Sequence, residues 1–477
     1  MSLQRYEYDL SKFVLNRTDV RFAYDTLLDN MVPQNGDLAS LWGSREYASG
    51  IDLSSGAIRA TFTDSKGVLY VVAGNKIQSY DGQKWNDRGT INTTSGNLTF
   101  VESQNPKDIN TYIYFCDGTY LYRIDRFSDI GRAQDISKHL PDVGNMTTQI
   151  QAQAAFITYY QHRLILTCGN SDKWFYSEVN PDGIDLSNEA TPLFPALNYK
   201  FSETQADPPR RVMATDLIYV LGERTVEVWQ PTGNFADPFA SNTQNNFLIG
   251  TNEPYSAVAY LNKVFFVATD SDIYMLDSGS LAKASNPGYN FYLRQLIYNA
   301  FPVCINYQRH IVFKRQGAYP LLFNPETFSL VECSNFENAI SSFWLDGEFK
   351  GFATAGKLYH TDSEAANVEN LPMRRLIKTP ILFPDNRIIM QSLEVQYACD
   401  TPPDNFNADD YQMFVCMSKD GGLNKSERRK YVIKKNQGIA KFYGWGMAHN
   451  PQFIIEFSIH AKLLIKRIAI FYKLLKK

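Results

Sequence analysis

The feature that most constrains the fold is a repeated pair of short strand-like runs between residues 60 and 365. In each pair, alternating aromatic and β-branched residues reach a Gly, Asp or Asn turn and a second such run. Residues 69, 113, 165, 218, 265, 312 and 352 mark the seven units, with spacings of 44, 52, 53, 47, 47 and 40. A period of about 40–50 residues with several strands per unit is typical of propeller blades. Because propellers are mostly platforms for binding and assembly, the repeat favours a scaffold over a single-domain enzyme.

Composition and the remaining segments complete the expected fold class. The chain of 477 residues is 44% apolar and 20% charged, and its 14% aromatic residues lie mostly in short alternating runs, as in strands. Near Leu371 the repeat gives way to further strand-like runs, at 388–398, 411–417, 430–434, 453–459 and 463–472. We therefore predict an all-β chain with an irregular β-propeller of about six or seven blades, followed by a C-terminal β-sandwich-like domain. The run around Phe352 is the weakest of the seven.

Three segments follow from this prediction, with one boundary near residue 60 and one near 370. Residues 1–60 read as an extended N-terminal leader, 61–370 as the propeller-like domain and 371–477 as a basic sandwich-like domain. The leader either supplies a strand that closes the ring or lies over a neighbouring subunit. The polar loop at 230–246 is either a contact element or disordered.

Charge is divided unevenly along the chain. Residues 371–477 carry 18 Lys and Arg against 9 Asp and Glu, a net of +9, whereas residues 1–370 have a net charge of −12. Such an asymmetry suggests complementary surfaces, self-assembly or handling of a polyanion, although a solvated basic face explains it equally well.

The sequence contains no recognisable catalytic motif. Phosphate loops, HExxH, GxSxG and dinucleotide fingerprints are absent, the six histidines are isolated, and the six cysteines form no CxxC pair and read as free thiols. No catalytic residue, cofactor or metal ligand is therefore predicted. The acidic groups Asp182/Asp185 and Asp409/Asp410 could serve glycoside hydrolysis, but both lie in turn-like sequence. A propeller glycosidase, a sialidase-like hydrolase or a carbohydrate-binding propeller remains the alternative. The sequence shows neither a signal peptide nor a membrane span.

Several short motifs, in order, resemble one known family. They are Leu28-Asp29-Asn30-Met31-Val32-Pro33, Trp42-Gly43-Ser44, Trp174-Phe175-Tyr176-Ser177, the run from Asp216 to Gly233 that contains Thr225-Val226-Glu227-Val228-Trp229, Leu393-Glu394-Val395 and Ser418-Lys419-Asp420-Gly421. In this order they resemble the tail-hub proteins of P22-like short-tailed bacteriophages, also called packaged-DNA stabilisation or head-completion proteins. The motifs are spread over most of the chain, and none is diagnostic alone.

The resemblance implies a structural virion protein made in the host cytoplasm and located in the tail. Such a protein forms a ring, expected to be a hexamer, below the portal and its adaptor. There it helps to retain packaged double-stranded DNA and forms part of the ejection channel. Its implied partners are the adaptor proteins, a tail needle, plug or nozzle, and tail spikes or fibres. The resemblance carries over no catalytic residue.

The basic C-terminal residues are the candidate assembly contacts. Arg428, Arg429 and Lys430 interleave with aromatic residues, and Lys466 and Arg467 interrupt the last strand-like run, where they would face solvent or a partner. A channel through which DNA slides should avoid dense positive charge, because such charge binds phosphates. We therefore expect the acidic propeller to contribute more of the channel lining, and the basic domain to supply more of the contacts to subunits or adaptor.

Overall fold

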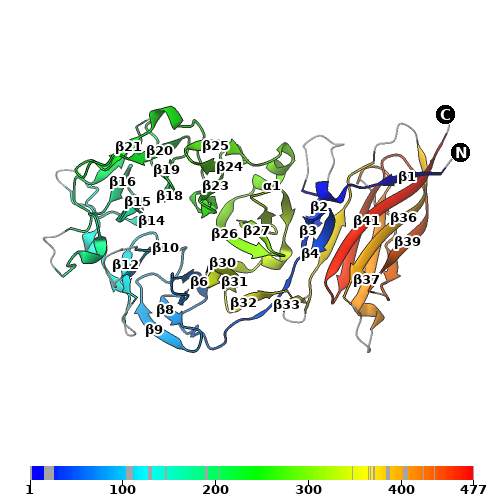
Figure 1. Ribbon diagram of the computed structural model, residues 1–477, viewed down its shortest axis with the longest axis horizontal. Coiled ribbons are helices and arrows are strands. Elements are labelled where there is room, and N and C mark those ends of the chain that lie inside the picture. The colour runs from blue at the N-terminus through cyan, green and yellow to red at the C-terminus, as the bar shows by residue number, and fades with distance from the viewer. Residues whose placement is uncertain are drawn as a thin grey trace.

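The computed structural model describes residues 3–15, 26–103, 111–126, 131–144, 148–187, 192–203, 205–345, 347–363, 365, 367–368, 371–382, 387–400, 407–422, 424–434 and 436–475. These residues form a ring of seven sheets with a two-layered sandwich beside it (Figure 1). The predicted fold class, an irregular β-propeller followed by a sandwich, is confirmed. Among the described residues the only α-helix is α1 (Asn290–Leu293), and no helix there is long and apolar enough to cross a membrane.

Four blades follow one another in the first part of the ring, each an antiparallel sheet in chain order. Blade 1 consists of β6 (Ile58–Thr63), β7 (Leu69–Ala73), β8 (Lys76–Tyr80) and β9 (Trp85–Thr90). Blade 2 consists of β10 (Thr99–Glu102), β11 (Tyr112–Cys116), β12 (Leu121–Asp125) and β13 (Gln134–Asp135). Blade 3 consists of β14 (Ala154–Tyr160), β15 (Arg163–Cys168), β16 (Lys173–Tyr176) and β17 (Tyr199–Phe201). Blade 4 consists of β18 (Arg211–Ala214), β19 (Ile218–Leu221), β20 (Val226–Pro231) and β21 (Phe239–Ser241).

Three more blades complete the ring. Blade 5 consists of β22 (Val258–Tyr260), β23 (Lys263–Val267), β24 (Ile273–Asp277) and β25 (Ser280–Lys283). Blade 6 consists of β26 (Ile297–Ile305), β27 (Gln308–Arg315), β28 (Leu321–Phe323) and β29 (Leu330–Glu332). Blade 7 consists of β30 (Ala339–Leu345), β31 (Glu348–Thr354), β32 (Leu358–Asp362) and β5 (Gly43–Glu46). The 3₁₀ helices are η1 (Leu10–Lys12), η2 (Ser137–His139), η3 (Pro181–Gly183), η4 (Thr243–Asn245), η5 (Pro254–Ser256), η6 (Pro287–Tyr289), η7 (Ser334–Phe336) and η8 (Ala408–Asp410).

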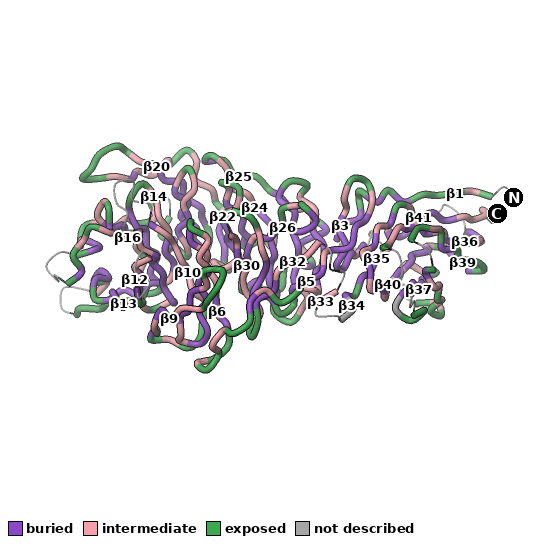
Figure 2. Tube along the Cα trace, turned by 60° about the horizontal axis from the view of Figure 1, so that its bottom comes forward, coloured by how far each residue is buried: buried purple, intermediate pink, exposed green. Residues whose placement is uncertain are grey.

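The repeated apolar runs of the sequence are the second strands of the blades. All five residues of β7 and all six of β15 are buried, because a neighbouring blade covers each face of the sheet. Figure 2 shows buried residues running through the inside of the propeller. The hydrophobic clusters between blades show this packing directly. Tyr70 and Val72 of blade 1 pack with Ile113 and Phe115 of blade 2, and equivalent clusters join each later pair around the ring. A strand buried on both faces needs a continuous apolar run rather than simple alternation.

The leader closes the ring. Strand β5 pairs antiparallel with β32, with Tyr359 opposite Glu46 and Asp362 opposite Gly43, and so supplies the fourth strand of blade 7. This is the first of the two roles expected for the leader. The loop at 230–246 is fully described and contains both β21, the fourth strand of blade 4, and η4.

The sandwich has two sheets built from both ends of the chain. One contains β3 (Met31–Gln34), β4 (Asp37–Ser40), β41 (Leu463–Leu474), β36 (Ile388–Cys399) and β39 (Gln437–Ala448), with β1 (Leu3–Glu7) paired to β41. The other continues blade 6 through β2 (Leu27–Asp29), β35 (Arg375–Lys378), β40 (Gln452–Ile459), β37 (Tyr411–Ser418) and β38 (Arg429–Val432). The short strands β33 (Asn367–Val368) and β34 (Leu371–Pro372) extend the sheet of blade 7.

The two sheets enclose one apolar core and share a seam with the propeller. Leu393 and Ile468 of the first sheet pack with Met413 and Ile455 of the second. At the seam, β2 runs parallel to β29 and antiparallel to β35, so one sheet passes without a break from blade 6 into the sandwich. The buried carboxylate of Asp29 accepts the backbone N–H of Ser334 at 2.9 Å, which ties β2 to blade 6.

Candidate functional site

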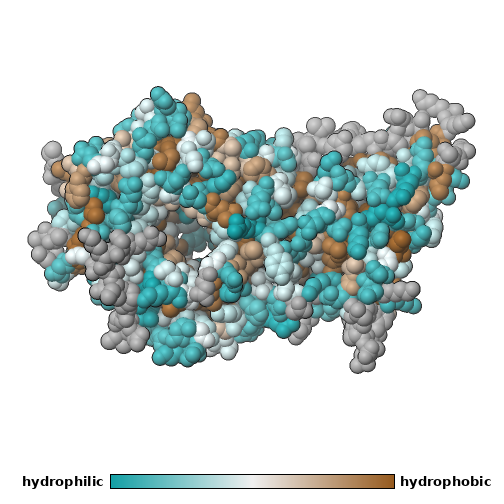
Figure 3. Space-filling model, in the orientation of Figure 1, coloured by the Kyte–Doolittle hydropathy of each residue, from teal (hydrophilic) through white to brown (hydrophobic). Residues whose placement is uncertain are grey.

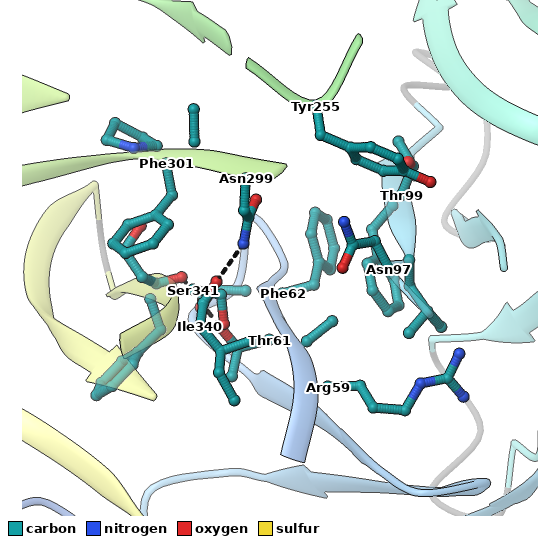
Figure 4. A pocket seen from close by; sticks show the side chains of 18 of the residues that line it. Arg59, Thr61, Phe62, Asn97, Thr99, Tyr255, Asn299, Phe301, Ile340 and Ser341 are labelled. Carbon is teal, nitrogen blue, oxygen red and sulfur yellow. Dashed lines mark hydrogen bonds between the residues drawn. The ribbon is translucent and has the colours of Figure 1, made fainter. Parts of the chain in front are cut away.

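A solvent-open cavity of about 370 Å³ lies at the centre of the propeller ring. The first strands of blades 1, 2, 6 and 7 form most of its wall, and Arg211 at the start of β18 and Tyr255 in η5 complete it. Figure 3 shows the ring hollowed at its middle, and Figure 4 shows the side chains that line the cavity. None of these lining residues is Asp or Glu, although residues 1–370 have a net charge of −12. The cavity is therefore a positively charged site in an acidic domain.

Arg59, one of the two lining arginines, is committed to the protein backbone. Its guanidinium donates to the carbonyl oxygens of Gly74 at 2.9 Å, Thr93 at 2.8 Å and Gly96 at 3.0 Å, and also to that of Ser95. In Figure 4 its side chain runs away from the other labelled residues. These bonds hold the loop between blades 1 and 2 and leave Arg59 little capacity to bind a ligand.

Arg211, the other lining arginine, has far fewer partners. Its Nη1 donates to the carbonyl oxygen of Pro254 at 2.8 Å, and its guanidinium lies 4.9 Å from the ring centroid of Phe156. Across the described part of the chain, no carboxylate lies within ion-pair distance of it. Burial lowers the pKa of Arg211 to about 10, so the group remains charged at neutral pH.

The polar groups of the cavity fall into two sets. Thr61 and Ser341 share a hydrogen bond of 2.8 Å, and Asn299 donates to the carbonyl oxygen of Ile340 at 2.6 Å, so these groups join blades 1, 6 and 7. The hydroxyl of Tyr255 lies on the other side of the cavity in Figure 4, near Asn97 and Thr99, and accepts or donates no hydrogen bond among the described residues. Burial raises the pKa of Tyr255, so its hydroxyl is neutral at pH 7.

The predicted basic residues at the start of β38, and Arg428 just before it, lie at one edge of the sandwich. Arg428 pairs with Glu456 at 2.8 Å and lies 3.7 Å from the ring centroid of Phe414. Arg429 donates to the carbonyl oxygens of Tyr443 and Gly444 and lies over the ring of Trp445, so it bridges the two sheets. Lys430 pairs with Asp409 at 3.2 Å.

Lys466 and Arg467 lie on the other sheet, at an irregular point in β41. The register with β36 shifts between Gln396, opposite Arg467, and Tyr397, opposite Ile465, so Lys466 is the extra residue of a β-bulge. Arg467 lies 3.6 Å from Glu394, which also binds Lys441 at 2.7 Å. Lys466 is exposed and has no ion-pair partner among the described residues.

The structure therefore does not bring the five basic residues together. Arg428 and Lys430 lie with the sheet of β37 and β40, whereas Lys466 and Arg467 lie on the sheet of β36 and β39. Four of the five contact carboxylates or carbonyls of the same chain, and Lys466 is the most available for a partner.

The carboxylates considered for glycoside hydrolysis have structural partners. Asp182 accepts hydrogen bonds from Ser103 at 2.6 Å and from Tyr114 at 3.0 Å, which joins blades 2 and 3. Asp185 binds Ser187, and Asp409 binds Gln412 and Lys430. Within the described residues, no group of three or more His, Cys, Asp or Glu could hold a metal ion.

A sequence comparison establishes the relationship of the chain to known proteins. The family model described as the β-propeller of bacteriophage P22 Gp10 matches residues 19–296, which is more than half of the chain. The chain belongs to this family. The P22 Gp10 family match confirms the resemblance seen in the sequence and identifies a phage stabilisation protein. It covers part of the leader and blades 1–5 and ends before β26.

Solved structures of low sequence identity are also similar to parts of this chain. Virginiamycin B lyase from Staphylococcus aureus is 12% identical, with a TM-score of 0.42 over 65% of this chain and 97% of that one. The extracellular domain of BT4673 from B. thetaiotaomicron is 10% identical, with a TM-score of 0.43 over 90% of this chain and 60% of that one. No curated protein sequence matches the chain.

Sequence reasoning did not identify Arg211 and Tyr255, the least satisfied residues of the cavity. They belong to segments 44 residues apart in the chain, and the rest of the wall comes from four other blade strands. No local motif marks such a site, since the ring alone brings the segments together. The one available signal was position, because Arg211 begins the first strand of a blade.

Proposed function

We propose that this P22 Gp10-family protein is a tail hub that assembles as a ring, expected to be a hexamer, below the portal and its adaptor. In this role it helps to retain packaged DNA and forms part of the channel through which the DNA leaves. The family match over residues 19–296 carries the proposal. Its partners would be the adaptor proteins, a tail needle, plug or nozzle, and tail spikes or fibres.

We infer further that the acidic propeller contributes more of the channel lining than the sandwich does. The net charge of −12 over residues 1–370 would let DNA slide, whereas the net charge of +9 over 371–477 would bind its phosphates. The sandwich would then supply more of the contacts to other subunits or to the adaptor. The bulge at Lys466 supports this division, because it presents a cation that the described residues of its own chain leave unpaired.

The experiment measures the mass of the purified protein, alone and mixed with a portal–adaptor assembly. We expect oligomers well above the 54.4 kDa of one chain and a stable complex with the adaptor. Lys466→Glu should weaken either the oligomer or the adaptor complex by about tenfold, the effect of a reversed charge at a contact. Lys350→Glu, at an exposed lysine of blade 7 that pairs with Glu348, is the matched control and should change neither.

Two results would contradict the proposal. A monomer that does not bind the adaptor would exclude the hub. A map of the assembled ring in which Arg428, Arg429 and Lys430 line the channel would exclude the division of surfaces while leaving the hub intact.

A further inference from the structure

The wall of the central cavity holds a half-buried cation, Arg211, whose hydrogen-bonding capacity is largely unused. A guanidinium has five N–H donors arranged as a fork that fits a carboxylate or a phosphate. Arg211 directs one bond to the carbonyl oxygen of Pro254 and places its plane near Phe156, and no other bond from it is made among the described residues. A charge that has lost part of its hydration favours an ionic partner, because the lost hydration is otherwise uncompensated.

The neighbours of Arg211 do not act as counter-ions. Tyr255 and Cys116 are the ionisable groups closest to it in electrostatic effect. Burial raises the pKa of both the Tyr255 hydroxyl and the Cys116 thiol, so both are neutral at pH 7. The positive charge of Arg211 therefore remains uncompensated within the cavity.

The two arginines of the cavity wall have different roles: Arg59 is structural, and Arg211 is available to bind a ligand. Arg59 donates to four backbone carbonyls and is saturated, so its charge serves the loop that it holds. Arg211 is not saturated, and the free hydroxyl of Tyr255 lies on the adjoining η5. Arg211 and Tyr255 together offer a fork of donors and one further donor or acceptor.

The size and the rest of the wall indicate which kind of anion fits. A volume of about 370 Å³ lies in the range of small-molecule sites. Aromatic side chains make much of the lining, including Phe62, whose ring stacks on Phe100 with centroids 5.4 Å apart, and Trp344. Aromatic walls favour a flat apolar body, and the missing Asp and Glu remove repulsion toward a negative group.

We propose that the central cavity binds a small organic anion, with a carboxylate or phosphate group paired to Arg211 and an aromatic body against Phe62 and Trp344. The Tyr255 hydroxyl provides a second hydrogen bond to the anionic group. This site is separate from the assembly role proposed above, since none of its residues lies in the sandwich.

The test uses the full-length protein and two probes, phenyl phosphate and benzoate, followed by titration calorimetry and by Trp344 fluorescence. At least one probe should bind with a stoichiometry of one per chain. Whichever binds more tightly assigns the anionic group as phosphate or carboxylate. Inorganic phosphate and acetate should bind at least tenfold more weakly, because they lack the aromatic body. The fluorescence change on binding should vanish in Trp344→Phe.

Variants then locate the anion. Arg211→Gln should weaken binding at least tenfold, and Tyr255→Phe by about ten- to a hundredfold, the usual range for a hydrogen bond to a charged group. Arg210→Gln is the matched control, since the neighbouring Arg210 pairs with Glu223 at 2.9 Å on the surface, and it should bind as the wild type does. Should Arg211→Gln fail to fold, Arg211→Lys takes its place with a loss of at least threefold, because an ammonium cannot form the bidentate pair.

The proposal is overturned if neither probe binds with a dissociation constant below about 1 mM. It is equally overturned if the Arg211 and Tyr255 variants that fold both retain wild-type affinity, or if binding leaves Trp344 fluorescence unchanged. None of these outcomes bears on assembly of the oligomer. The proposal of an anion site and the proposal of a tail hub can therefore be contradicted separately.

Discussion

The propeller and the sandwich are both built of antiparallel strands, but they bury those strands differently. In the propeller, neighbouring blades cover both faces of each sheet, and every residue of β7 and β15 is buried. In the sandwich each sheet has one covered face, and along β36 buried and partly exposed residues largely alternate. The first arrangement leaves little sheet surface free for partners, whereas the second leaves two outer faces and the edge strands β38 and β39.

The same contrast holds for charge. Between blades 1 and 2, Arg126 lies with Asp64 and Glu102, and its side chain is only 6% exposed. On the sandwich, Arg428 and Glu456 form a pair whose side chains are 52% and 37% exposed. The Arg126 cluster therefore connects two blades inside the propeller, while the Arg428–Glu456 pair lies where another molecule can reach it.

The largest expected effect is the difference in the free energy of unfolding when one charge is removed from each region. Arg126→Gln leaves Asp64 and Glu102 buried without their cation and should lower the free energy of unfolding by about 3–5 kcal/mol. Arg428→Gln removes an exposed pair and should change it by less than about 1 kcal/mol. Chemical denaturation of both variants measures the two effects, and equal losses would contradict the contrast between enclosed and accessible charges.

The sequence predicted the part of this fold that is local. The period and the turns follow from short runs, as at Gly74, where φ is +55° and an added Cβ would lie 1.9 Å from the carbonyl oxygen of Ser55. The seventh run looked weak because it contains Gly351, whose missing Cβ lets Tyr359 approach closely in the next strand. A residue chosen for close approach interrupts the apolar pattern that marks a strand.

The parts that were not predicted depend on contacts between distant segments. Leu3 pairs with Lys473 and Glu46 with Tyr359, and no periodicity encodes which of many strands will meet. The same limit applies to the basic residues, whose sequence spacing did not show that Arg428 and Arg467 lie on different sheets. It also applies to the cavity, which is assembled by closure of the ring.

The closing strand β5 joins the two regions, so a change there tests how far the ring depends on the leader. An added Cβ at Gly43 would lie 2.3 Å from the backbone oxygen of Asn367, and the neighbouring backbone would have to move. Gly43→Ala should therefore lower the free energy of unfolding by about 2–3 kcal/mol, a typical cost of overpacking. Gly356→Ala, in the turn between β31 and β32 with open space around it, is the control and should cost less than about 1 kcal/mol. If Gly43→Ala melts at the same temperature as the wild type, closure of the propeller by β5 adds little to the stability of the protein.

The smallest effect concerns the half-buried acidic group of Glu253 in the acidic propeller. Burial raises the pKa of Glu253 to about 7 from its ordinary value of 4.5, and its Oε2 atom is buried with no hydrogen-bond partner among the described residues. Between these two pKa values the folded chain holds a proton that the unfolded chain releases, so this group lowers stability as the pH rises from about 4.5 to 7. Glu253→Gln removes the titration, and it should raise the melting temperature by about 1–2 °C at pH 8 and leave it unchanged near pH 4. The control Glu223→Gln removes the exposed partner of Arg210 and should leave the melting temperature nearly unchanged. A melting temperature difference that is the same at both pH values would mean that Glu253 is charged at no cost, and that the propeller interior is more hydrated than its buried strands indicate.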